Sequence, residues 1–175
     1  MRLQLAAWPE VENYLKTSSS IIIPIGSTEQ HGPNGLIGTD AICPTAIAYE
    51  LEEKIEVLIG PTLAVGMAQH HLGFPGSIAF RSSTLLAVVR DVVESLTGQG
   101  FTHIYFLNGH GGNVATVTAA FSEIWSISSF AGSEAPPPCL RLRNWYLGPR
   151  VNRLSDERYG DAEGSHATPS EVSLS

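Results

Sequence analysis

Cysteines and basic residues are scarce in this sequence. The two cysteines, Cys43 and Cys139, lie far apart, and neither belongs to a CxxC pair. We therefore expect two small buried thiols, not a disulfide framework or a thiolate metal site. Only 10 residues are Lys or Arg against 17 Asp or Glu, which gives a formal net charge of −7 and a pI of about 5.3. An acidic chain repels polyphosphate and anionic lipid, which argues against nucleic acid and membranes as partners.

Long apolar runs are also absent from the sequence. None reaches the ~18 residues that span a bilayer, and the N-terminal segment is broken by Trp8, Pro9 and Glu10, unlike a signal peptide. We therefore expect a cytoplasmic protein. Apolar residues still make up 43% of the 175 positions, enough for the core of a single domain over residues 1–175. Because the final SEVSLS reads as the interior of a motif, we expect the natural chain to continue beyond Ser175.

Apolar periodicity divides the chain into alternating helices and strands. Helices are predicted, from a first-turn proline or a 3.6-residue apolar period, at 7–16, 41–55, 83–98 and 113–127. Strands are predicted, from short β-branched or apolar runs, at 21–25, 57–59, 103–107 and 139–146. This alternation predicts a layered α/β/α domain with a mostly parallel sheet. Polar composition predicts a surface connection at 128–138 and loops after Gly148.

The ends of some segments carry specific signals. Pro24 cannot donate a ladder hydrogen bond, so strand pairing is expected to end early there. Thr39 or Asp40 is suited to cap the second helix, and Ser83 is suited to cap the third. Two glycine-rich loops, 26–40 and 108–113, directly follow predicted strands. Since ligands of parallel sheets bind beyond the carboxyl ends of the strands, we expect both loops on one side of the sheet.

The first loop holds Glu29, His31 and Asp40. Glu29 and His31 are two residues apart, so an extended backbone would point both side chains to the same side. The glycine-rich stretch that follows allows Asp40 to turn back toward them. Carboxylate oxygen and imidazole nitrogen are the ligands expected for catalytic Zn²⁺ or Mn²⁺. The alternative is a helix cap, a solvated Glu and a surface His.

The second loop reads Asn108-Gly109-His110-Gly111-Gly112-Asn113. Glycines around His110 allow the backbone to turn sharply and other groups to approach the imidazole. The loop lacks the GKS/T ending of a phosphate loop and does not match GxGxxG. A metal-ligating His110 is the better interpretation, and a histidine in a glycine-rich turn is the alternative.

A third cluster lies near the end of the sequence, where His166 and Glu171 follow Asp161 and Glu163. His166 suits an acid–base catalyst and Glu171 a metal ligand, although a polar tail would look the same. The adjacent His70 and His71 are left open: one of them could belong to the site, could hydrogen-bond a ligand, or could do neither.

Together these segments resemble the creatininase (creatinine amidohydrolase) family. The matching stretches occur in order along residues 20–175: IPIGSTEQHGP at 23–33, GTD at 38–40, HLGFPGS at 71–77, LNGHGGN at 107–113 and HATPSEVS at 166–173. The first and fourth stretches are specific, and their joint presence in this order argues against coincidence.

The resemblance implies an α/β protein with a parallel-rich sheet, two divalent metal ions per subunit (Zn²⁺ or Mn²⁺) and a homo-oligomer, often a hexamer. It implies that Glu29 and His110 bind one ion, His31 binds the other, and Asp40 bridges them. It further implies that His166 is the catalytic histidine of the family's HAGExETS segment and that Glu171 is that segment's second glutamate.

The sequence departs from the family pattern in two places. Thr168-Pro169 stands where the family segment has Gly-Glu, and Gly112 stands where creatininase itself has a metal-binding glutamate. Glu171 is then the expected replacement ligand. The second departure also leaves open a substrate other than creatinine, because relatives with NGHGGN include formamide hydrolases and a peptidase of redox-cofactor maturation.

The sequence therefore predicts a metal-dependent amidohydrolase that cleaves a C–N amide bond, in a cyclic amide or a formamide, with a water activated by two metal ions. The alternatives are a non-catalytic member that binds a small molecule, a peptidase-like member that acts on a peptide, and a flavin or nucleotide binder that uses the glycine-rich turn. The sequence names neither the substrate nor the physiological metal.

Overall fold

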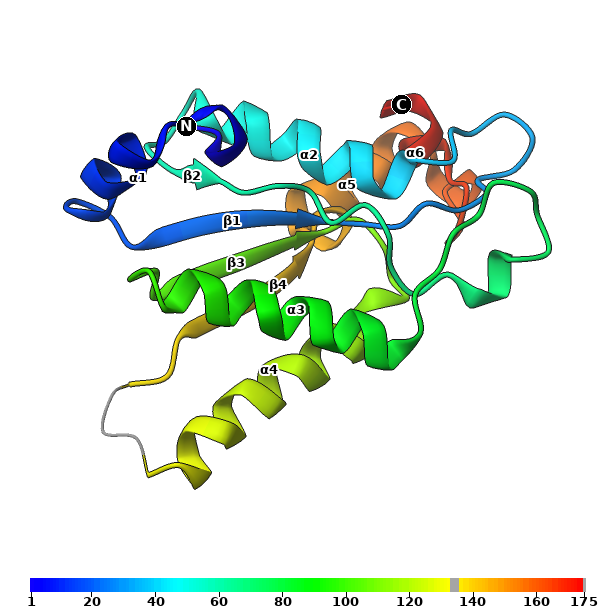
Figure 1. Ribbon diagram of the computed structural model, residues 1–175. Coiled ribbons are helices and arrows are strands. Elements are labelled where there is room, and N and C mark those ends of the chain that lie inside the picture. Colours follow the sequence, from blue (N-terminus) through cyan, green and yellow to red (C-terminus); the bar gives the residue numbers. More distant parts are fainter. Residues whose placement is uncertain (133–135, 175) are drawn as a thin grey trace.

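The computed structural model describes residues 1–132 and 136–174, and its centre is a four-stranded parallel sheet (Figure 1). The strand order is β2-β1-β3-β4, and each neighbouring pair is parallel. The bounds are Ser20–Ile25 for β1, Leu58–Ile59 for β2, His103–Asn108 for β3 and Cys139–Asn144 for β4. The predicted parallel sheet and its four strands are confirmed.

Helices cover both faces of the sheet, which confirms the layered α/β/α prediction (Figure 1). Successive side chains of β1 point to opposite faces of the sheet, so each face packs against its own layer of helices. Ile21, Ile23 and Ile25 belong to the larger core cluster with residues of α3 and α4, whereas Ile22 packs with Ala48 of α2 on the opposite face. The helix bounds are Trp8–Leu15 for α1, Thr39–Glu52 for α2, Ser82–Thr97 for α3 and Asn113–Phe130 for α4.

Pro24 lies inside β1, and its effect on strand pairing differs between the two sides of the strand. On one side the pairing with β3 continues through Pro24, opposite Leu107. On the other side the Pro24 carbonyl accepts a hydrogen bond from the Leu63 N–H at 2.9 Å, beyond the end of β2 at Ile59. The missing N–H therefore faces the side where β2 has already ended. The expected early end of pairing is correct toward β2 and wrong toward β3.

Two predicted helix caps are wrong. Gly38 is the N-cap of α2, so Thr39 and Asp40 lie in its first turn, and Arg81 is the N-cap of α3, so Ser83 lies inside it. The side chain of Asp40 is buried and hydrogen-bonded to His31 instead of the helix N-terminus. Tertiary contacts thus outweigh its capping preference.

The region after Gly148 is not loop-like, contrary to the prediction. It contains α5 (Pro149–Arg158) and α6 (Pro169–Leu174), and short 3₁₀ helices η3 (Trp145–Leu147) and η4 (Gly160–Ala162) flank α5. Proline at the first position favours the start of α5. Its surface is polar, so it lacks the apolar period that indicates a buried helix. The predicted connection 128–138 is shorter, because α4 extends to Phe130, and residues 133–135 lie outside the described residues.

The order in which strands are added to the sheet switches at β1: β2 lies on one side of β1, and β3 and then β4 lie on the other. After β1 the chain enters α2 on one face, and after β3 it enters α4 on the other. Because β1 and β3 are neighbours, the loops after them diverge at a topological switch point, which is where ligands bind in such sheets. Short 3₁₀ helices η1 (Leu3–Leu5) and η2 (Gln69–His71) complete the described elements. Across residues 1–132 and 136–174, none of the helices is both long and apolar enough to cross a bilayer.

Candidate metal centre

Glycines allow three chain segments to meet at the switch point. A β-carbon at Gly26, after β1, would lie 2.1 Å from the carbonyl oxygen of Asp40. A β-carbon at Gly109, after β3, would lie 2.0 Å from the same oxygen. No other residue type fits at these two positions without moving the backbone of α2. The start of α2, which carries Asp40, is therefore held against both loops.

Four of the predicted site residues converge there. The Oδ1 of Asp40 lies 3.0 Å from His31 Nε2, and its Oδ2 lies 2.9 Å from His110 Nδ1. The Oε1 of Glu29 lies 3.2 Å from His110 Nδ1. All four side chains are buried: Glu29 and His31 are 1% exposed, Asp40 is 3% and His110 is 6%. The structure thus brings together both carboxylates and both histidines of the two loops.

The second ring nitrogen of each of these histidines faces a backbone carbonyl. His31 Nδ1 lies 3.1 Å from the carbonyl oxygen of Glu29, and His110 Nε2 lies 2.8 Å from that of Met67. A carbonyl only accepts, so each of these nitrogens carries the proton. In the neutral rings the lone pairs then fall on His31 Nε2 and His110 Nδ1, which face the carboxylates, and a second proton or a cation can occupy those positions. This is the usual arrangement of a metal-ligating histidine.

Two buried carboxylate oxygens in the cluster have few partners among the described residues. Oε2 of Glu29 has no hydrogen-bond partner, and Oδ2 of Asp40 has only His110 Nδ1, at 2.9 Å. A buried polar atom left without a partner costs about 1–3 kcal/mol. Divalent cations would satisfy both oxygens, so the donor set fits the metal ions that the sequence predicts.

The pKa shifts of the two histidines also indicate that this cluster favours bound positive charge. Burial lowers the pKa of His110, but hydrogen bonds and charge from Asp40 and Glu29 outweigh it and raise the pKa to about 10. Burial also lowers the pKa of His31, and the Asp40 carboxylate raises it further than burial lowers it. The carboxylates therefore favour positive charge at the ring nitrogens, either as protons or as cations.

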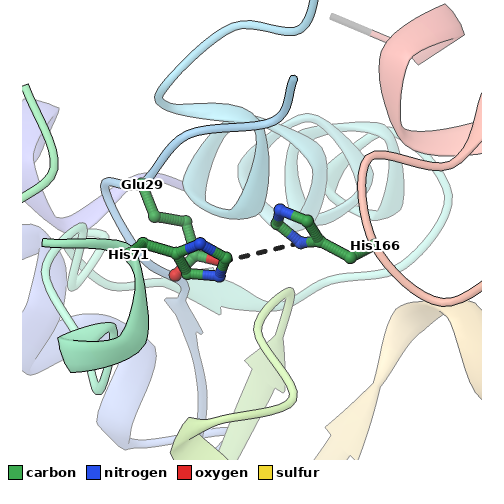
Figure 2. A group of neighbouring side chains, drawn as sticks. All are labelled: Glu29, His71 and His166. Carbon is green, nitrogen blue, oxygen red and sulfur yellow. Dashed lines mark ion pairs between the residues drawn. The ribbon is translucent and has the colours of Figure 1, made fainter. Parts of the chain in front are cut away.

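His71 and His166 approach Glu29 from two other segments (Figure 2). His71 Nε2 lies 3.3 Å and His166 Nδ1 lies 4.0 Å from Glu29 Oε1. Burial lowers the pKa of His71, which favours its neutral form. Ligand atoms of Glu29, His71 and His166 lie within 4.8 Å of one another, as do those of Glu29, His31 and Asp40. Both groups satisfy the distance requirement of a cation site.

Glu171 belongs to α6. It lines the same cavity, but its Oε2 accepts the Thr168 N–H at 2.9 Å, and its own N–H donates to Thr168 Oγ1 at 3.2 Å. These reciprocal bonds form a capping box at the start of α6. The Thr168-Pro169 departure thus has a structural explanation, since Pro169 is the first residue of that helix.

The cluster lies at the base of a cavity of about 710 Å³. Its wall is formed by the loops 26–40 and 108–113, by α5 and by the segment before α6. The lining includes Glu29, Asp40, His71, His110, Tyr146, Val151, Asn152, Ser155, His166 and Glu171. The sequence pattern leaves the role of His71 open and does not single out Gln30, which hydrogen-bonds both His71 and His166. The position of Gln30 between Glu29 and His31 was the available signal.

The fold and the site define a class: layered α/β proteins with a buried carboxylate–histidine cluster at the switch point of a parallel sheet. Within that class the chain belongs to the creatininase family, because the family profile described as creatinine amidohydrolase matches residues 4–175. The predicted family is therefore confirmed.

Characterised relatives differ in what they act on. Over 106 residues the chain is 33% identical to the mycofactocin precursor peptide peptidase of Mycolicibacterium smegmatis, covering 57% of this chain and 42% of the relative. Over 173 residues it is 28% identical to the 3-dehydro-scyllo-inosose hydrolase of Thermotoga maritima, covering 98% and 53%. Over 109 residues it is 30% identical to the creatinine amidohydrolase of Pseudomonas putida, covering 59% and 42%. The chain spans about half the length of these relatives.

Solved structures share the fold. A structure described as creatininase Mn superposes with a TM-score of 0.81 at 23% identity, covering 95% of this chain and 67% of that one. A structure described as a putative creatinine amidohydrolase from Bacteroides fragilis gives 0.72 at 28% identity, covering 98% and 64%. These likenesses agree with the α/β architecture described above.

Proposed function

We propose that the chain is a metal-dependent amidohydrolase that cleaves a C–N amide bond of a small molecule, either a cyclic amide or a formamide. The observation that carries this proposal is the arrangement of His31 and His110. Each has one nitrogen committed to a backbone carbonyl and the other aimed at a buried carboxylate that lacks a full set of partners. That pattern is expected of ligands and is not required of a solvated polar cluster.

The geometry suggests how two ions would be shared. Asp40 presents one oxygen to His31 and the other to His110, so it suits a bridging ligand. Glu29 would complete the coordination of the ion at His110, because its Oε1 lies 3.2 Å from His110 Nδ1. Glu171, on the cavity wall, would serve the ion at His31. Solved relatives described as creatininase Mn and as a Zn–Zn type support Mn²⁺ or Zn²⁺.

Two divalent cations, when bound, would polarise the amide carbonyl and lower the pKa of a bound water to near neutrality. The chain's own residues would supply the rest. His166 is about one-third exposed at the cavity, with Nδ1 4.0 Å from Glu29 Oε1, so it can assist departure of the leaving nitrogen as a hydrogen-bond or proton donor. Tyr146 and α5 would orient the substrate and limit water around it.

A peptidase is the second candidate function, and two observations favour it. Identity to the mycofactocin precursor peptide peptidases reaches 35% over 114 residues. The cavity of about 710 Å³ falls in the range that suits drug-sized ligands, so it has room for part of a peptide. The same carboxylate–histidine cluster with its metal ions would suit peptide hydrolysis, because peptides and formamides are both amides.

A hydrolysis screen with matched metal analysis tests the proposal. The purified chain, stripped of metal and reloaded with Zn²⁺ or Mn²⁺, is assayed on creatinine, formamides and short peptides. We expect close to two ions per chain and metal-dependent release of amine from at least one class. Cleavage of peptides alone would favour the second candidate. One ion or none, together with no hydrolysis, would favour a non-catalytic small-molecule binder. Flavin absorbance that survives chelation would favour the nucleotide-binding alternative.

A further inference from the structure

Gln30 connects His71 and His166, the two histidines that approach Glu29 from outside the loops 26–40 and 108–113. Its Nε2 lies 2.9 Å from His71 Nδ1 and 3.0 Å from His166 Nε2. One side-chain amide thus reaches a ring nitrogen in η2 and another in the segment before α6, 41 and 136 residues away in sequence.

The orientation of this amide is set by its other contacts. Gln30 Oε1 accepts the Gly32 N–H at 2.8 Å, and the Gln30 backbone N–H donates to Ser77 Oγ at 3.2 Å. Rotating the amide by half a turn would set its NH₂ group against the Gly32 N–H, donor to donor. The NH₂ group therefore faces the two histidines, and it can only donate.

Because the amide donates, the ring nitrogens that face it must accept. In neutral rings the proton then lies on the other nitrogen: Nε2 of His71 and Nδ1 of His166. These are the atoms that lie 3.3 Å and 4.0 Å from Glu29 Oε1. Both histidines thus present an N–H, not a lone pair, to the carboxylate and the cavity.

This is the reverse of the arrangement at His31 and His110. There, carbonyl oxygens accept from the far nitrogen and leave a lone pair facing the carboxylates. The histidines of the site therefore divide into two chemical kinds, although Glu29, His71 and His166 also satisfy the distances of a cation site. Distance alone cannot separate the two kinds, but the partner of the far nitrogen does.

We infer that Gln30 is a positioning residue that holds His71 and His166 as N–H donors facing Glu29 and thereby excludes both from metal ligation. The functional part of this inference rests on the proposed amidohydrolase activity. The Nδ1–H of His166 is thereby held toward the cavity, where it can donate a hydrogen bond to the substrate. His71, whose N–H is 3.3 Å from Glu29 Oε1, holds the carboxylate toward His110.

Histidine tautomers provide a direct test. The chain is labelled with ¹⁵N-histidine, and long-range ¹H–¹⁵N spectra are recorded without metal and with Zn²⁺, with ring signals assigned from single His→Gln variants. We expect the unprotonated nitrogens to be Nδ1 of His71 and Nε2 of His166. In Gln30→Glu a carboxylate accepts where the amide donated, so both tautomers should reverse. Gln99→Glu makes the same chemical change at an exposed site and should leave the spectra unchanged.

Gln30→Met keeps the length of the side chain without its hydrogen bonds, and serves if Gln30→Glu does not fold. It should replace the single tautomers with mixtures. Both variants should lower kcat at least 10-fold without more than doubling KM, because His166 then no longer presents a fixed N–H to the substrate. Loss of an ion in His71→Gln, or a proton on Nδ1 of wild-type His71, would overturn the inference. The tautomers are measured without turnover, so they remain informative even if the proposed activity fails.

Discussion

The Nε2 of His110 lies 2.8 Å from the carbonyl oxygen of Met67, on a loop that follows β2. This contact fixes which nitrogen of His110 faces Glu29 and Asp40. Asn113 supports it, because its Oδ1 accepts the Met67 N–H at 3.0 Å and its Nδ2 donates to the Gly26 carbonyl at 2.9 Å. One asparagine thus ties the Met67 segment to the loop after β1 and to the start of α4.

Gly112 should be intolerant of even a methyl group. A β-carbon there would lie 2.4 Å from His110 Nε2 and 2.5 Å from the Met67 carbonyl oxygen. Gly112→Ala should therefore separate these two atoms and weaken metal binding about 10–100-fold, as loss of a ligand's hydrogen-bond partner does. Competition with a chromophoric chelator measures the affinity. Gly111→Ala is the matched control, since its β-carbon would meet only Tyr146 Oη, at 3.4 Å. Equal affinities for the two variants would contradict this role of Gly112.

Asp40→Asn should remove the stabilisation that metal confers. The amide keeps the size of the carboxylate but cannot bridge two cations between His31 and His110. In the wild-type chain, metal at 100 times its dissociation constant should raise the free energy of unfolding by about 2.7 kcal/mol. In the variant that increment should fall below about 0.5 kcal/mol. Denaturant titration with and without Zn²⁺ measures both, and the exposed Glu53→Gln is the control. A full increment in Asp40→Asn would rule out the bridging role.

The stabilisation by metal should grow as the pH rises. In the metal-free protein burial lowers the pKa of His110, but Asp40 and Glu29 raise it to about 10, from 6.5 in the unfolded chain. The stability from this protonated ring is complete below pH 6.5 and is lost as the pH rises through about 10. A cation in place of the proton prevents that loss. The difference in Tm between metal-loaded and metal-free protein should thus be larger at pH ~9 than at pH ~7. A difference that does not change with pH would count against the assignment of His110.

Substitutions at Glu171 and Thr168 test separately whether Glu171 binds metal and whether it caps α6. Gln is also accepted in a capping box, so Glu171→Gln should keep α6 and change the unfolding free energy of the metal-free protein by less than about 0.5 kcal/mol. If Glu171 binds the ion at His31, the same variant should lower metal affinity at least 10-fold. Thr168→Ala should do the opposite: it should cost about 1 kcal/mol of stability and leave metal affinity unchanged. Unaltered affinity in Glu171→Gln would leave Glu171 with the capping role alone.

The convergence of Glu29, His31, Asp40 and His110 could be predicted because it follows from chain topology. Both loops leave the carboxyl ends of parallel strands, and spacing places Glu29 and His31 on one side of the chain. The helix α5 could not be predicted from apolar periodicity, because none of its residues is buried and its side chains are mostly polar. The division of the histidines into two kinds depends on what Gln30 and Met67 contact, and sequence spacing does not encode those contacts.

Metal content of His110→Ala tests the central claim most directly. The wild-type and variant chains are stripped, reloaded with Zn²⁺, desalted and analysed by inductively coupled plasma mass spectrometry, with far-UV circular dichroism as the check of folding. A methyl group cannot replace an imidazole ligand, so we predict close to two ions per wild-type chain and one or none in the variant. Two ions per chain in a folded His110→Ala would contradict the account.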